Sequence, residues 1–300
     1  MNNSRKGILL TIIGGVFWGL SGVCGQYLFS KKALTPDWLT TIRLTMAGLI
    51  MIFISIISKK EIKPLFKVWR NKRDSIRLIA FSFLGMAACQ YTYFVTIEAS
   101  NASTATILQY TAPVLIMVYL SFKNKTLPKK KEVFILALVV LGTFFIVTHG
   151  NIHSLAISKR AFVWGIISAF SVAVYNIMPV KLMNKYGTVL VLGWGMIIGG
   201  IFMTLISQPW HIPGIWDVRT WCALAGVIIG GTVLSFSFYL EGVRLIGASK
   251  ASLFASSEPL TSTILTALVM KTAFTGMDIL GLVLILAGVT FLSVINKNNN

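Results

Sequence analysis

Ten long apolar runs, separated by short polar connections, decide what kind of fold this chain can adopt. They cover roughly residues 7–30, 37–58, 76–97, 102–122, 133–149, 160–184, 188–208, 220–242, 248–271 and 276–296. A helix needs about 20 apolar residues to cross the hydrocarbon core of a bilayer, and most of these runs reach that length. The chain is 55% hydrophobic and 12% charged, which excludes a soluble domain and disorder alike. We therefore predict an all-α integral membrane protein with ten transmembrane helices.

Two of the runs share a pattern that indicates an internal duplication. Residues 102–113 (ASTATILQYTAP) and 248–259 (ASKASLFASSEP) both begin with Ala-Ser and end in proline, at an offset of 146 positions. Tyr93 and Tyr239 precede the two motifs at the same offset. Five spans in each repeat would place the second repeat upside down relative to the first, as in many secondary transporters. We predict two inverted five-helix repeats, residues 1–149 (spans 1–5) and 150–300 (spans 6–10).

The basic residues indicate orientation. The formal charge of +18 is spread through short connections between apolar runs and forms no continuous soluble face, so nucleic-acid binding is not expected. With the amino terminus inside, the inner segments hold 20 Lys and Arg residues and the outer segments hold 6. Positive charge concentrates in cytoplasmic loops. We expect a multi-pass protein of the plasma (cytoplasmic) membrane with both termini in the cytoplasm.

The ninth run carries a carboxylate and a proline at its centre, Glu258 and Pro259. An acid in the middle of a bilayer is costly unless it faces a cavity, a partner or a substrate. We predict that Glu258 is the titrating group of a transport site and binds a coupling proton or a substrate ammonium. The alternative is a structural acid that satisfies backbone groups freed by Pro259. Pro113 and Pro259 are predicted to mark matching helix discontinuities.

Ten spans in two five-span repeats, each with a small-residue entry followed by a mid-span proline, resemble the EamA-type branch of the drug/metabolite transporter superfamily. The Phe17-Trp18-Gly19 element, Arg43 near the start of the second run, Glu258-Pro259 and the Leu286–Val289 segment are also similar to that branch. The resemblance covers essentially the whole chain. It implies a metabolite carrier, often an exporter of amino acids or related compounds. It also implies a central cavity surrounded mainly by spans 1–4 and 6–9, with spans 5 and 10 peripheral.

One departure from the family pattern is visible. Many relatives have an acidic residue just after the fourth and ninth spans, where this chain has Lys123 and Lys271. A role of that acid elsewhere therefore does not transfer to this chain.

Polar and aromatic residues at mid-depth of the implied cavity spans are the candidate substrate-binding residues. They are Trp18, Gln90, Tyr93, Gln109, Tyr110, Tyr175, Asn176, Tyr239, Ser256 and Glu258. For each, packing or an interhelical hydrogen bond is the alternative interpretation. Arg43 is expected to be a structural cation, or one whose head reaches the membrane interface, rather than a substrate ligand.

No enzyme, cofactor or metal site is expected. The three histidines, His149, His153 and His211, have no metal-ligand spacing, and there is neither a Walker A sequence nor a nucleophile elbow. The three cysteines lie in apolar runs at no ligand spacing.

These features favour a secondary active transporter. We expect it to move a small organic metabolite, an amino acid or amine-like compound, by alternating access, with protons as the candidate coupling ion. Export is favoured through the resemblance. The alternatives are an uptake carrier for a cationic or sugar-like metabolite and a passive facilitator or pore.

Overall fold

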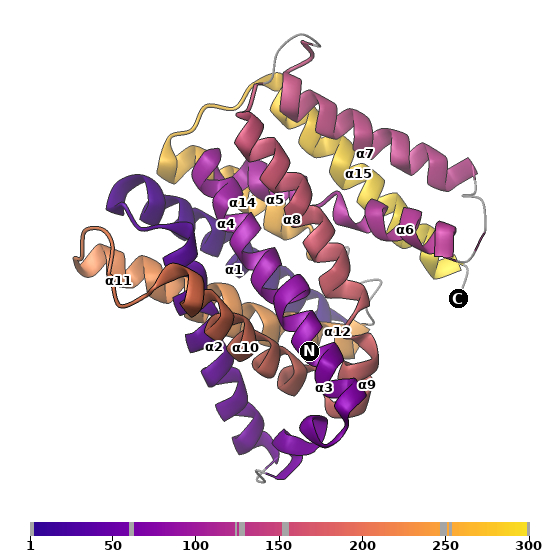
Figure 1. Ribbon diagram of the computed structural model, residues 1–300. Coiled ribbons are helices and arrows are strands. Elements are labelled where there is room, and N and C mark those ends of the chain that lie inside the picture. The colour runs from indigo at the N-terminus through magenta and orange to yellow at the C-terminus, as the bar shows by residue number, and fades with distance from the viewer. Residues whose placement is uncertain are drawn as a thin grey trace.

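A computed structural model describes residues 3–59, 63–123, 125, 130–151, 156–246, 251 and 254–298. Every regular element within these residues is a helix (Figure 1). Part of the second Ala-Ser motif (residues 248–250, 252 and 253) and His153 lie outside them. Exposed large apolar side chains such as Phe53, Leu205 and Leu268 cover helix surfaces, as expected for contact with lipid.

Seven helical segments of the described chain are long and apolar enough to cross a membrane. They are Asn3–Lys32, Pro36–Ile57, Lys72–Ala99, Ala102–Lys123, Lys159–Tyr186, Thr188–Ser207 and Val218–Val243. Two shorter apolar helices, Val133–Thr148 and Gly276–Phe291, fall at the predicted fifth and tenth spans. The predicted ninth span contains α14 (Ser257–Met270). The all-helical, multi-pass class is confirmed, whereas ten spans in two repeats stay a prediction.

The third and eighth runs fold in the same way. Each is an α-helix interrupted by a π-helical segment: α3 (Lys72–Ala80), η2 (Phe81–Ala87) and α4 (Ala88–Ala99) in one, and α11 (Val218–Ala225), η3 (Gly226–Leu234) and α12 (Ser235–Ile246) in the other. Segments of this kind release backbone carbonyls and occur often at functional sites.

The fourth and ninth runs are both interrupted by a turn. The fourth divides into α5 (Ala102–Gln109) and α6 (Ala112–Lys123), and in the ninth a turn at residues 255–256 precedes α14. Pro113 and Pro259 lie in the first turn of the helix that follows. A missing N–H costs little there because no intrahelical acceptor is available for it.

Helix pairs form across the two halves of the chain. α1 (Asn3–Lys32) packs against α12 and α14, and α8 (Lys159–Ile177) packs against α4, α5 and α6. α2 (Pro36–Lys59) packs against α10 (Thr188–Ser207). α7 (Lys130–Thr148) and α15 (Gly276–Asn298) lie side by side at the edge of the bundle (Figure 1). Two further helices are η1 (Lys63–Arg70) and α9 (Val180–Tyr186).

Glycine allows the closest approach between α1 and α14. A Cβ on Gly19 would lie 2.7 Å from the carbonyl oxygen of Glu258 and 2.9 Å from the backbone nitrogen of Ser262. Small residues at this spacing let two membrane helices pack backbone to backbone. Gly19 therefore holds the first turn of α14, with Glu258, directly against α1.

Candidate functional site

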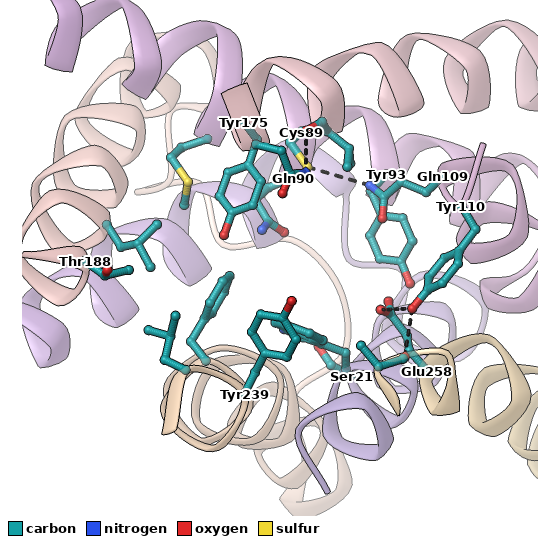
Figure 2. Close-up of a pocket in the computed structure, with 18 of the residues that line it drawn as sticks. Ser21, Cys89, Gln90, Tyr93, Gln109, Tyr110, Tyr175, Thr188, Tyr239 and Glu258 are labelled. Carbon is teal, nitrogen blue, oxygen red and sulfur yellow. Dashed lines mark hydrogen bonds between the residues drawn. The ribbon is translucent and has the colours of Figure 1, made fainter. Parts of the chain in front are cut away.

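A cavity of about 370 Å³ lies between the helices of the two halves. Nine of the ten predicted substrate-binding residues line it: Trp18, Gln90, Tyr93, Gln109, Tyr110, Tyr175, Asn176, Tyr239 and Glu258. Figure 2 shows Glu258 and Tyr110 at one end and Thr188 at the other. The geometry thus brings together residues that are far apart in the sequence, while their roles stay predictions.

The tenth predicted residue, Ser256, is not among the residues that line the cavity. Its Oγ is buried and has no hydrogen-bond partner among the described residues. Pro259 is also not among the lining residues, although the neighbouring Glu258 is.

The carboxylate of Glu258 projects into the cavity beside Tyr110 (Figure 2). The Tyr110 hydroxyl donates to the carbonyl oxygen of Ala255 at 2.8 Å and lies 3.5 Å from Oε2 of Glu258. Tyr110 belongs to the α5–α6 turn and Ala255 to the turn before α14, so the two helix interruptions touch each other. In the described part of the chain, no cation comes within 4.0 Å of the carboxylate.

Aromatic side chains form much of the remaining wall. The Trp18 ring packs edge-on against Phe236 and at an angle against Tyr239, with both centroid distances 5.2 Å. Tyr175 also packs against Phe236, with the two ring centroids 6.5 Å apart. Sequence reasoning missed Phe236, although it lies at the repeat offset of 146 from the predicted Gln90.

Three of the polar residues already have hydrogen-bond partners. The Tyr93 hydroxyl lies 2.8 Å from Oγ1 of Thr106, and the Gln109 amide donates to Oγ of Ser168 at 2.8 Å. Asn176 is exposed and donates to a carbonyl of its own helix.

The polar groups of Gln90, Tyr175 and Tyr239 make no hydrogen bond to any residue that the structure describes. They line the cavity, and their hydrogen-bonding capacity is therefore available to a ligand.

Arg43 is a cavity residue that the sequence did not single out for binding. It lines the cavity, is only 4% exposed and packs over the Phe94 ring at 5.2 Å. Its Nε donates to Oγ1 of Thr232 at 2.9 Å and its Nη2 to the Gly231 carbonyl at 3.1 Å. The interfacial interpretation is therefore wrong, because the head of the side chain is buried inside the bundle. The signal available in the sequence was a basic residue, Arg43, inside the second apolar run.

Two ion pairs join the halves at opposite ends of the bundle. At one end, Lys32 of α1 pairs with Asp217, the cap of α11. At the other, Lys185 of α9 pairs with Asp74 of α3 at 2.7 Å. The ion pair with Lys32, together with hydrogen bonds from Thr220, holds the pKa of Asp217 well below its usual range.

The chain matches the EamA-like transporter family over residues 5–148 and 159–294. It belongs to this family. The EamA chain is 39% identical, over 98% of its own length and 97% of the relative's, to the uncharacterized inner membrane transporter YicL of Salmonella typhimurium. It is 20% identical to the uncharacterized transporter YyaM of Bacillus subtilis over 94% and 92% of the two chains. A solved crystal structure shares its fold with a TM-score of 0.64, at 16% identity over 99% of both chains. This protein is therefore a multi-pass membrane transporter of the EamA type.

Proposed function

We propose that this EamA-family chain is a secondary active carrier that exports a small organic metabolite, an amino acid or amine-like compound, across the plasma membrane. The observation that carries the proposal is the Glu258 carboxylate, which faces the cavity without a cationic partner within 4.0 Å among the described residues. An ammonium group on the substrate would supply that partner.

The cavity wall fits such a compound. A carboxylate forms strong, charge-assisted hydrogen bonds with an ammonium group. The faces of Trp18, Tyr110 and Tyr239 offer both apolar contact and cation–π attraction. A volume of about 370 Å³ lies in the range of small-molecule sites.

Alternating access by two inverted five-helix repeats is supported by the pairing of helices. The contact of α1 with α12 corresponds, at the repeat offset, to the contact of α8 with α4. The Lys32–Asp217 and Asp74–Lys185 pairs likewise join the end of the first span of one half to the start of the third span of the other. Two equivalent contacts at opposite ends suit a carrier that opens at one end while the other stays closed.

Glu258 is proposed to couple substrate movement to protons. A carboxylate that binds a proton and a substrate cation in turn exchanges one for the other, which links their gradients. Export, both termini in the cytoplasm and the plasma membrane as location rest on the family and on the distribution of basic residues.

Two alternatives are separable by experiment. An uptake carrier for a cationic or sugar-like compound would use the same cavity in the opposite direction, and a passive facilitator would lack obligatory exchange. Purified protein in proteoliposomes, preloaded with an unlabelled amino acid, should accelerate entry of the labelled compound. Strictly downhill, non-saturating flux would contradict the carrier, and right-side-out vesicles that accumulate substrate would contradict export.

A further inference from the structure

We propose that Arg43 binds an anionic group of the transported compound, so that the cavity selects molecules carrying opposite charges on two separate groups. This inference rests on the carrier function proposed above. It narrows the choice between an amine and a compound that also carries a carboxylate or a similar anion.

Arg43 places a buried charge at the cavity wall. Its side chain is 4% exposed, yet it lines the same cavity as Glu258. A buried charge is costly unless it is paired, and this holds most strongly within a membrane. No described carboxylate lies within 4.0 Å of Arg43 to neutralise it.

The described hydrogen bonds of Arg43 use only some of its N–H donors. A guanidinium has five N–H donors, and the described contacts occupy Nε and one position on Nη2. Both acceptors, Oγ1 of Thr232 and the Gly231 carbonyl, are neutral. They explain how the side chain is held but not why it is charged. Nη1 donates to no residue that the structure describes, so the edge formed by Nη1 and Nη2 can still receive a carboxylate through two parallel bonds.

The guanidinium of Arg43 is held in a fixed place. The Thr232 and Gly231 bonds anchor it to η3, and Phe94 lies under its face at 5.2 Å. A donor group held in this way loses little conformational freedom when it binds a ligand. Arg43 is therefore suited to recognition as well as to packing.

The charges of Arg43 and Glu258 are separate from each other. Arg43 and Glu258 line one cavity but form no ion pair with each other within 4.0 Å. An amine alone would neutralise Glu258 and leave Arg43 buried without a counter-ion. A compound with both an ammonium and an anionic group would neutralise both.

The wild-type protein can test this without any substitution. Thermal unfolding of the full chain in detergent would be measured with two matched sets: phenylalanine, phenethylamine and 3-phenylpropanoate; and leucine, 3-methylbutylamine and 4-methylpentanoate. Ligands that bind the folded state raise the midpoint of unfolding. We expect at least one amino acid to stabilise at a concentration on the order of tenfold or more below its amine and its acid. An amine as effective as its amino acid, or no stabilisation by any compound, would overturn the proposal.

Substitutions then assign the two groups. Arg43→Gln should reduce the stabilisation by the amino acid to that given by the amine. Arg43→Lys should restore part of the lost stabilisation. Glu258→Gln should reduce the stabilisation by the amino acid to that given by the acid. Arg219→Gln is the control, because it makes the same substitution at an exposed residue that does not line the cavity. If Arg43→Gln unfolds, the wild-type series still decides. Counterflow of an amine by the wild type would show that the carrier stands while the role of Arg43 fails.

Discussion

Lys32, the last residue of α1, forms an ion pair with Asp217, whose carboxylate also caps α11 by accepting from the backbone N–H of Thr220 at 2.8 Å. One carboxylate therefore performs two tasks. It neutralises a lysine whose side chain is 11% exposed, and it satisfies a free N–H at a helix start. The contact joins the first span of one half to the eighth predicted span in the other.

Asp217→Ala should lower the unfolding midpoint more than Lys32→Ala, because it removes the cap as well as the ion pair. The pKa of folded Asp217 lies below its unfolded value of about 3.9, so the unfolded state binds more protons between these two values. Its stabilising effect is thus complete above the unfolded pKa and is lost as the pH falls through the folded pKa. Unfolding midpoints at pH 7 and at pH 3 to 4 should show a smaller difference between wild type and Asp217→Asn in acid. An unchanged difference would contradict this.

Gly19→Ala should destabilise the protein by about 1–3 kcal/mol, because the added Cβ would lie 2.7 Å from the Glu258 carbonyl oxygen and must push α1 and α14 apart. Gly276→Ala is the matched control, since no heavy atom of the described residues beyond its chain neighbours and its own helix backbone lies within 4 Å of its Cβ position. Denaturation in detergent compares the two. Equal stability of the two variants would mean that the close approach of α1 and α14 is unimportant.

Glu258→Gln keeps size and hydrogen-bonding capacity but removes the charge. If Glu258 is the coupling group, the variant should fold and should lose pH-dependent accumulation of substrate. Tyr110→Phe removes the neighbouring hydroxyl and leaves the carboxylate, so it should retain pH dependence. Uptake into proteoliposomes at several pH values measures both. A wild-type rate and pH profile for Glu258→Gln would indicate a structural acid.

Pro113→Ala and Pro259→Ala should leave folding largely intact and lower transport several-fold. Alanine restores an N–H and favours helix, so each helix can extend back through the turn that precedes it. Pro36→Ala, at the first residue of α2 and away from the cavity, is the control. Loss of folded protein with unchanged activity in the remainder would show that the prolines serve stability alone.

Reporter fusions test the orientation. Fusions at Lys67 and Lys130 should be cytoplasmic, and those at Asp217 and His153 should be external, because the predicted inner segments hold 20 of the basic residues. An external Lys130 would contradict the inverted repeat.

Much of the candidate site could be predicted because a charged residue and a proline stand out within an otherwise apolar run. Glu258 and Pro259 each violate what a lipid-facing helix requires, and the offset of 146 pointed to the helix interruption near Pro113 and to Tyr239. Helical class and membrane insertion likewise follow from the length and hydropathy of the runs, which are local properties.

The tertiary structure decided which side chains meet. It left Ser256 out of the cavity wall and brought in Phe236 and Arg43. It also paired Tyr110 with the carbonyl of Ala255, 145 positions away. These contacts depend on how closely helices approach and how they are rotated about their axes. Both are set by packing between distant segments, as where Gly19 admits α14, and no local pattern along the chain contains that information.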